Sequence, residues 1–142
     1  MEYENPFWQV VKGELPQPNA ARLLGWRFVD YQQASRQIEV EFDASPSLTN
    51  PLGYIQGGML TAMLDDCMGP AIYAVLRREQ VAVTTQMTTR FIRPALPGRI
   101  LGRARLVRCG QKGWYTSGQL MDAEHNVLVT GRARFKVFEP PR

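Results

Sequence analysis

The sequence predicts an α+β protein in which one antiparallel β-sheet curls around a long central helix. Residues 57–79 form the one long stretch with helical spacing, and apolar side chains fall nearly all around it, which is typical of a buried helix. Two strand-like runs precede this stretch and four follow it. Because no repeat or long linker separates these runs, the simplest arrangement is a single sheet that covers the helix. We expect one domain over residues 1–142, long enough to bury its own core.

An N-terminal helical extension is expected over residues 1–25, ahead of the sheet. Residues 7–11 form a short amphipathic piece, and residues 20–24 form a second piece that ends at Gly25, a residue suited to a helix C-cap.

The strands follow from runs of alternating apolar and polar residues. The six expected strands span residues 26–31, 37–42, 81–94, 99–109, 113–122 and 127–139. In the last strand Arg132, Arg134 and Lys136 alternate with small and apolar residues, so the basic side chains face water and the other set faces the core. A loop rich in Pro, Ser, Thr and Gly covers residues 44–55.

The long helix contains one break signal. Gly69 and Pro70 lie inside its apolar pattern, and a proline within a helix removes a backbone donor and bends or ends the helix. We therefore expect a kink or an early end near residue 69.

Composition excludes several classes of protein. The chain is 44% hydrophobic and 21% charged, and no apolar run approaches the ~20 residues of a membrane span. Its start does not resemble a basic signal peptide, so we expect a cytoplasmic protein that does not bind a membrane. Cys67 and Cys109 are too few for a disulfide framework, and His125 is the only histidine, so no metal site is expected.

The charge of the chain is divided between its halves. Through residue 70 there are four Lys and Arg against nine Asp and Glu, and from residue 71 onward there are thirteen against four. Fourteen of the seventeen basic residues are Arg, whose rigid fork suits phosphate and carboxylate groups. Nucleic acid, a small phosphate-bearing ligand and solvated strand faces all remain compatible with this pattern.

The stretch from Asn50 to Asp66 carries the strongest functional signal. A Pro/Gly loop leads into Gly57 and Gly58, which open the apolar helix and leave its first N–H groups accessible to a negatively charged ligand. Asp65 and Asp66 follow inside that helix, where a carboxylate is costly to bury without a partner or a role. An anion-stabilising helix start combined with an embedded carboxylate is typical of acyl transfer or hydrolysis.

These motifs resemble the hotdog-fold acyl-coenzyme A thioesterases, in the PaaI-like branch named for phenylacetic-acid degradation. The resemblance covers about residues 20–138. It rests on the residue pattern Asn50–Gly53, the helix start Gln56–Gly58, Asp65, the run Phe91–Pro94 and Gly98. It implies a hotdog fold, hydrolysis of an acyl- or aryl-CoA thioester, and no cofactor beyond the CoA of the substrate.

The resemblance also implies roles for five residues. Asp65 is the general base or nucleophile, and the N–H of Gly57 polarises the thioester carbonyl. Asn50 and Thr84 position the carboxylate, water or substrate. Gln56 stands where the branch usually has His, and glutamine can orient a carbonyl but cannot carry a charge.

Helix geometry adds an argument about assembly. Gly57 and Asp65 are eight residues apart, which is a rise of roughly 12 Å along a helix. One thioester carbon cannot lie ~3 Å from both groups of the same helix. The amide and the carboxylate must therefore come from two chains, so the functional interpretation requires a homodimer, with a dimer of dimers left open.

Substrate contacts are assigned more coarsely. The nucleotide end of CoA should meet the basic half of the chain, and the candidate residues are Gly58, Arg93, Arg108, Gly110 and Lys112. The acyl group should lie between helix and sheet, and the candidate wall residues are Tyr54, Met59, Met63, Met68, Tyr73 and Trp114. Chain length and aromatic or aliphatic character of the acyl group do not follow from the sequence.

Two positions and three other functions remain as alternatives. Asp66 could replace Asp65, and Thr85 could replace Thr84, because a slip of one residue exchanges the faces of a strand. A non-catalytic acyl-CoA-binding hotdog module is the main competing function, and Gln56 favours it. A dehydratase or hydratase needs a positioned histidine, which His125 does not offer, and no aromatic–basic motif for RNA binding is present.

Overall fold

The computed structural model describes residues 5–141. The helices are α1 (Pro6–Val11), α2 (Asn19–Leu24) and α3 (Gly57–Tyr73), with a short 3-10 turn at Pro46–Leu48. The strands are β1 (Trp26–Gln32), β2 (Gln37–Ala44), β3 (Val81–Phe91), β4 (Gly98–Gly110), β5 (Gly113–Met121) and β6 (Val127–Phe138).

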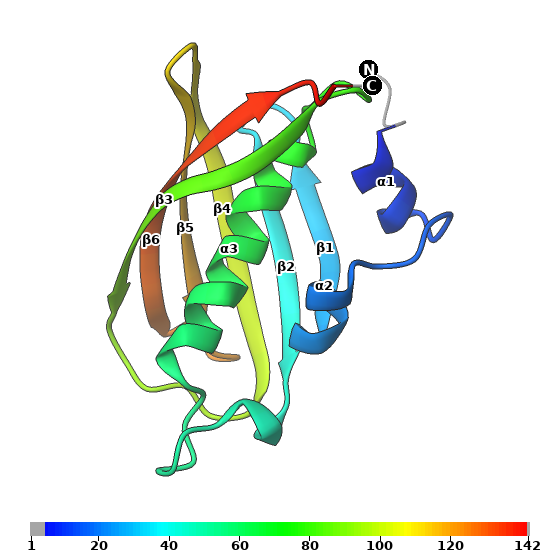
Figure 1. Ribbon diagram of the computed structural model, residues 1–142. Helices are drawn as coiled ribbons and strands as arrows, with labels where there is room; N and C mark the ends of the chain where they lie inside the picture. Colours follow the sequence, from blue (N-terminus) through cyan, green and yellow to red (C-terminus); the bar gives the residue numbers. More distant parts are fainter. Residues whose placement is uncertain (1–4, 142) are drawn as a thin grey trace.

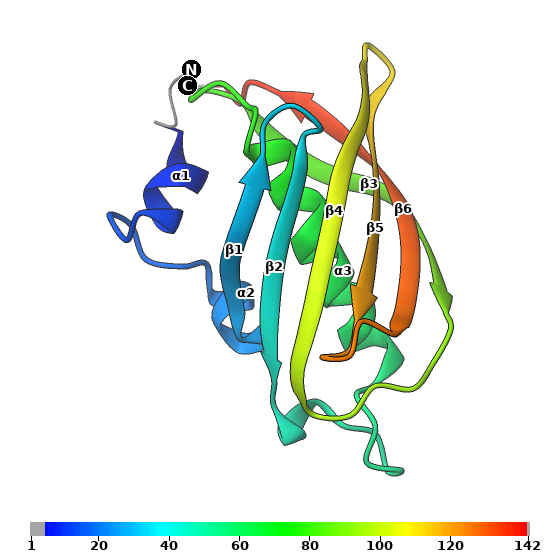
Figure 2. The ribbon, with the colours of Figure 1, turned by 180° about the vertical axis from the view of Figure 1, so that it is seen from behind.

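The six strands form one antiparallel sheet in the order β1-β2-β4-β5-β6-β3. The sheet curves around α3, and α1 and α2 lie beside the β1 edge (Figures 1 and 2). The predicted α+β architecture, a sheet wrapped around one long helix, is confirmed. None of the helices in the described part of the chain has the length and apolar character needed to cross a membrane.

Glycines on the inner face of the sheet allow α3 to pack closely. A Cβ atom added at Gly102 would lie 2.3 Å from the Sγ of Cys67, and one added at Gly131 would lie 2.5 Å from the Cδ2 of Leu64. Both distances are far inside normal contact, so only glycine fits at these two positions.

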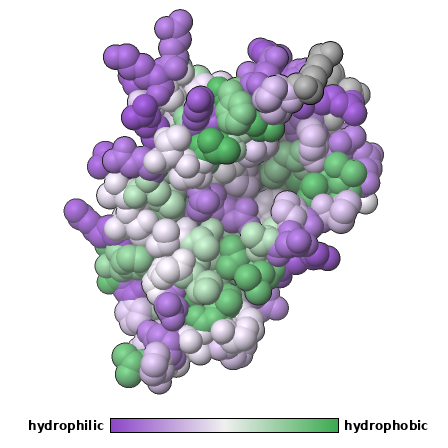
Figure 3. All heavy atoms as spheres, viewed as in Figure 1, coloured by the Kyte–Doolittle hydropathy of each residue, from purple (hydrophilic) through white to green (hydrophobic). Residues whose placement is uncertain are grey.

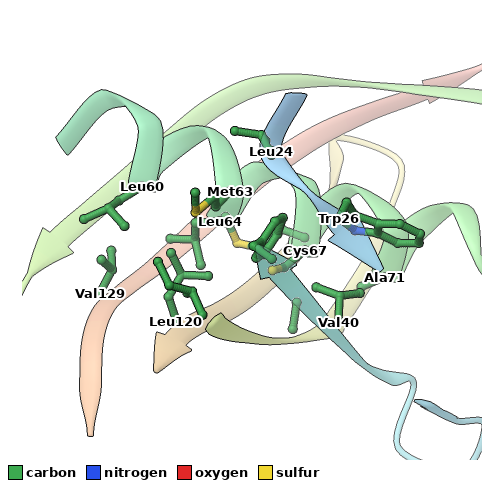
Figure 4. Close-up of a cluster of buried hydrophobic side chains, with 14 of the residues drawn as sticks. Leu24, Trp26, Val40, Leu60, Met63, Leu64, Cys67, Ala71, Leu120 and Val129 are labelled. Carbon is green, nitrogen blue, oxygen red and sulfur yellow. The ribbon is translucent and has the colours of Figure 1, made fainter. Parts of the chain in front are cut away.

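The core lies between α3 and the sheet. Met63, Leu64, Cys67 and Met68 have no exposed surface, and they meet apolar residues from β2, β5 and β6 (Figure 4). The helix therefore functions as the centre of the core, as its all-round apolar pattern predicts.

The end of α3 differs from the prediction. The helix continues through Pro70 and ends at Tyr73, so it neither stops at residue 69 nor extends to residue 79. Pro70 has no N–H to donate to the carbonyl oxygen of Asp66, and the indole Nε1 of Trp26 takes that place at 2.9 Å. The helix therefore survives its proline because β1 supplies the missing donor.

The N-terminal extension caps the last turn of α3. The Nδ2 of Asn5 donates to the carbonyl oxygens of Tyr73 (2.8 Å) and Leu76 (2.9 Å), and the indole of Trp8 donates to that of Ala74 (3.0 Å). The carbonyl oxygen of Tyr73 also accepts from the N–H of Leu76 at 3.3 Å, whereas those of Ala74 and Leu76 lie beyond the helix. Asn5 and Trp8 therefore supply donors that water would otherwise provide at this helix end. Asn5 also accepts from the N–H of Trp8, which caps α1 itself.

Strand ends agree with the predicted ones within a few residues, and β3 shows the main difference. It ends at Phe91 rather than residue 94, and its pairing with β6 shifts between Thr84 and Gln86. This bulge changes which side chains of β3 face the helix, a point that sequence alternation does not reveal.

Candidate active site

The loop before α3 is shaped by Asn50. Its side-chain oxygen accepts hydrogen bonds from the N–H groups of Leu52 (3.0 Å) and Tyr54 (3.2 Å). Gly53 adopts a φ of +87°, which favours glycine, and the N–H of Ile55 donates to the oxygen of Ala95. In this chain Asn50 therefore builds the turn that leads into the helix.

The first residues of α3 present unpaired donors. Gln56 is the N-cap residue and is exposed, and its side chain makes no capping hydrogen bond. Within residues 5–141, the N–H groups of Gly57 and Gly58 have no acceptor. The ring of Phe91 lies 3.5 Å from the position that a Cβ of Gly57 would occupy, so a small apolar wall flanks these donors. An anionic oxygen can approach this helix start.

Asp65 has one hydrogen-bond partner at the middle of α3. The hydroxyl of Thr84 donates to its Oδ1 at 2.8 Å, whereas the hydroxyl of Thr85 donates to the carbonyl oxygen of Arg134 at 3.0 Å. The register of β3 therefore places Thr84 with the carboxylate and directs Thr85 into the sheet. A threonine hydroxyl holds one carboxylate oxygen and leaves the other available.

Asp66 differs from its neighbour in environment. Its Oδ2 is buried and has no hydrogen-bond partner among the described residues. Burial, with a smaller contribution from the charge of Asp65, raises the pKa of Asp66 from 3.8 to about 7. The two adjacent carboxyl groups therefore have different chemistry, and Asp66 holds its proton up to neutral pH.

A cavity of about 460 Å³ opens beside these carboxyl groups. Its lining consists of Pro6, Phe7, Val10, Pro18, Ala21, Trp26, Asp65, Asp66, Gly69, Pro70, Tyr73, Ala82, Thr84 and Phe135. Figure 3 shows the side of the molecule that carries α3, where apolar patches surround smaller hydrophilic ones. The cavity is thus largely apolar, with two carboxyl groups and the hydroxyl-bearing side chains of Tyr73 and Thr84 in its wall.

The six candidate wall residues had ordinary core packing as their alternative, and the cavity separates the two cases. Of the six candidates only Tyr73 lines the cavity, while Met63 and Met68 are fully buried core residues. The sequence interpretation missed the residues that α1 and α2 contribute. The signal was the short amphipathic stretch at residues 7–11, whose apolar side chains need a surface to cover.

The structure divides the remaining predicted catalytic residues into two groups. Thr84 lies with Asp65, whereas Asn50, Gln56 and Gly57 lie at the start of α3. A rise of roughly 12 Å separates the two groups along the helix. Within one chain the two groups of candidate residues therefore do not meet.

The predicted phosphate-binding residues do not form one cluster in the chain. Arg93 follows the end of β3, where it donates to the carbonyl oxygen of Val127 at 2.6 Å. Gly110 ends β4 and Lys112 lies in the turn to β5, while the guanidinium of Arg108 stacks 4.8 Å from the ring centre of Tyr115. From the strand register, more than roughly 15 Å separates the two ends of the sheet. One nucleotide cannot contact both ends of a single chain.

A basic hollow of about 570 Å³ occupies the outer face of the sheet. Its charged residues are Arg90, Arg103, Arg105 and Arg132. On β6 Gly131 turns toward Leu64 of α3, so the adjacent Arg132 points away from the helix. On β4 the buried Ala104 faces the core, so its neighbours Arg103 and Arg105 point to the outer face. The sheet therefore separates this hollow from Asp65.

The comparisons with known proteins identify the family. The sequence profile described as thioesterase superfamily matches residues 52–129. A putative thioesterase of Ralstonia eutropha JMP134, described as phenylacetic acid degradation-related, is 33% identical, with 92% of this chain and 98% of that chain covered and a TM-score of 0.88. The chain belongs to the thioesterase superfamily. Its sheet and central helix are those of the hotdog fold.

Other solved structures share this fold at lower identity. The PaaI protein of the phenylacetic acid degradation operon of E. coli is 17% identical, with 93% of both chains covered and a TM-score of 0.78. A Bacillus halodurans protein, solved with CoA, is 25% identical, with 70% of this chain and 66% of that chain covered and a TM-score of 0.67. A search of curated proteins finds no match.

Proposed function

We propose that the protein hydrolyses an acyl- or aryl-CoA thioester to the free acid and CoA. The observation that carries this proposal is the hydrogen bond from Thr84 to Asp65 at the edge of an apolar cavity. This contact orients a carboxylate where an acyl group can lie against it. Membership of the thioesterase superfamily and the CoA in the Bacillus halodurans structure support the same reaction.

In the proposed reaction Asp65 takes a proton from a water molecule whose oxygen attacks the thioester carbonyl carbon. The carbonyl oxygen becomes an oxyanion that accepts a hydrogen bond from the free N–H of Gly57 at the start of α3. Collapse of the tetrahedral intermediate breaks the C–S bond, and the departing thiolate takes a proton to give CoA. Direct attack by the Asp65 carboxylate, followed by hydrolysis of the anhydride, uses the same groups.

The two groups of one site come from two chains in this proposal. Gly57 and Asp65 of one helix lie too far apart to meet at one carbon, whereas a two-fold pair brings the helix start of one chain to the middle of its mate. Among the described residues β3 pairs only with β6, so its other edge is free. Apolar Val83, Phe91 and Ile92 are about half exposed along this edge, at 46%, 53% and 46%. An edge of this kind favours pairing with a second copy.

Release of the free CoA thiol from a panel of acyl-CoA substrates tests the function. Asp65→Asn keeps the size of the side chain and removes the base, so turnover should fall by at least ~100-fold with the fold intact. Thr84→Val should cost about tenfold, because one charge-assisted hydrogen bond of roughly 1.5 kcal/mol is lost.

Thr85→Val and Asp66→Asn are the matched controls, and both should retain most of the turnover. If only the Asp66 variant lost activity, the catalytic carboxylate would be Asp66 and not Asp65. Binding of acyl-CoA without any release of thiol would instead favour the competing function, an acyl-CoA-binding module with Gln56 in place of a histidine.

A further inference from the structure

The N-terminal extension forms a firmly anchored wall of the cavity. Asn5 and Trp8 tie α1 to carbonyl oxygens at the end of α3 and just beyond it through three hydrogen bonds of 2.8–3.0 Å. Phe7 packs edge-on against Trp8 and Trp26, with ring centres 5.1 and 6.2 Å apart. These contacts fix the side of α1 that carries Phe7 and Val10 against the helix and β1.

The wall faces the apolar part of the cavity. Phe7 and Val10 from α1 and Ala21 from α2 line the cavity together with the apolar Pro70 and Phe135. The volume of about 460 Å³ falls within the range of small-molecule pockets, roughly 300–1,000 Å³. Without the extension, this side of α3 and β3 would be open to water.

We propose that α1 and α2 complete the acyl-binding pocket and set the size and charge of the acyl group that the protein accepts. The proposal rests on the proposed function, because it assigns the acyl group to the cavity next to Asp65. The accepted group is bulky, apolar and uncharged.

The charges in the cavity wall exclude one class of substrate. The lining contains two acidic residues, Asp65 and Asp66, and no Lys, Arg or His. Asp66 holds its proton up to neutral pH, so Asp65 supplies the negative charge. An acyl group with a terminal carboxylate, such as succinyl, would lose its hydration among apolar side chains and meet a like charge without a basic partner. The pocket should therefore discriminate against dicarboxylic acyl groups of the same length.

Two variants change the size of the pocket in opposite directions. Val10→Trp fills the cavity from α1, so the ratio of kcat/KM for octanoyl-CoA and phenylacetyl-CoA over acetyl-CoA should fall at least fivefold. Phe7→Ala enlarges the cavity, so the ratio of lauroyl-CoA over octanoyl-CoA should rise. Val29→Trp is the matched control, because Val29 is 45% exposed on β1 and lies outside the cavity.

Binding measurements separate this proposal from the hydrolysis reaction. Thioether analogues of acetyl-, octanoyl- and suberyl-CoA cannot be hydrolysed, and their affinities are measured by calorimetry on the wild-type chain and on Val10→Trp. Suberyl has the eight carbons of octanoyl and adds a terminal carboxylate. We expect octanoyl binding to be at least fivefold tighter than both acetyl and suberyl binding, and the preference for octanoyl over acetyl should be lost in Val10→Trp.

The outcomes distinguish the two proposals. If the protein hydrolyses acyl-CoA but the kcat/KM ratios between substrates stay within twofold of the wild-type values in both pocket variants, the proposed role of α1 and α2 is wrong. The thioesterase function would be unaffected by that result. If the wild type releases no thiol but binds the analogues according to acyl length, and Val10→Trp abolishes that dependence, the proposed pocket stands and the proposed hydrolysis is wrong. Absence of both binding and hydrolysis would overturn both. Circular dichroism and thermal melting establish that the variants are folded.

Discussion

The indole of Trp26 on β1 donates a 2.9 Å hydrogen bond to the main-chain oxygen of Asp66 on α3. In an uninterrupted helix that oxygen would accept from residue 70, which here is a proline. The contact therefore replaces the missing backbone hydrogen bond in the turn that follows Asp65 and Asp66. Figure 4 shows Trp26 beside α3. Trp26 also lines the cavity, so one side chain supports both the helix and the pocket.

Trp26→Phe should destabilise the protein by about 2 kcal/mol or more. The substitution leaves a buried carbonyl oxygen without a donor and removes part of a buried ring. Urea unfolding followed by circular dichroism measures the change. Trp114→Phe is the control, because Trp114 is half-buried and its indole donates no hydrogen bond to the described residues. Equal losses in the two variants would show that the bond to Asp66 contributes nothing specific.

The buried carboxyl group of Asp66 should make stability depend on pH. Its pKa is raised from 3.8 to about 7 in the folded protein, so between these pH values the folded state holds more protons than the unfolded state. The free energy of unfolding should therefore fall as the pH rises from 4 to 7. At about 1.4 kcal/mol for each tenfold change in proton affinity, the upper limit of this loss is about 4 kcal/mol.

Asp66→Asn isolates this contribution. The variant should differ little from the wild type at pH 4 and should be the more stable of the two at pH 8, because the amide carries no proton to lose. Urea midpoints at both pH values give the comparison, with Asp30→Asn on exposed β1 as the control. A wild-type advantage that grows toward pH 8 would contradict the burial effect.

Basic residues should contribute to binding of the CoA phosphates. We expect KM for an acyl-CoA to rise with salt, since exposed charge pairs are screened. Arg93→Ala should raise KM with little change in kcat. Arg93 lies two residues after Phe91, whose ring flanks Gly57 at the start of α3. Arg108→Ala tests the other end of the sheet, where the guanidinium already stacks on Tyr115. Arg78→Ala is the control, because Arg78 is exposed. A KM that does not change with salt concentration would show that these arginines face solvent and do not bind the phosphates of CoA.

Mixed dimers should recover activity from two inactive variants. Asp65→Asn removes the base, and Gly57→Val places a branched side chain where the carbonyl must approach, against the ring of Phe91. A mixed dimer then has one site with both lesions and one site with neither. After co-refolding at equal ratio, about half of the dimers are mixed and activity should reach roughly a quarter of the wild-type value.

Light scattering and circular dichroism first establish that each variant folds and pairs. Activity no greater than the sum of the two separate variants, with mixed dimers demonstrated by mass spectrometry, would rule out a site shared between chains. Full activity in Asp65→Asn homodimers would instead remove the carboxylate from the mechanism.

Local sequence determined the helix and most of the sheet. The apolar residues of α3 occur on all its sides, and a helix with that pattern is stable only when a sheet surrounds it. The glycines at its start, the loop shaped by Asn50 and the position of Asp65 are equally local, because they depend on helix geometry and turn chemistry. These features are visible in the order of residues along the chain.

Only the tertiary structure decided how α3 passes its proline and which threonine meets Asp65. Trp26 is forty positions from Asp66 in sequence. The residues around Pro70 therefore do not reveal that the indole of Trp26 supplies the missing donor. Thr84 and Thr85 are adjacent, and the bulge that follows Thr84 in β3 sets which of them faces the helix.

The pocket depended on tertiary structure most of all. Met63 and Met68, two of the candidate wall residues, are core residues, while Phe7 and Val10 line the cavity from a segment more than fifty residues away from Asp65 in sequence. Periodicity reports which side of an element is apolar, but it does not report what that side meets. A helix pattern therefore predicts its own burial, whereas a cavity exists only where several distant segments fail to fill the space between them.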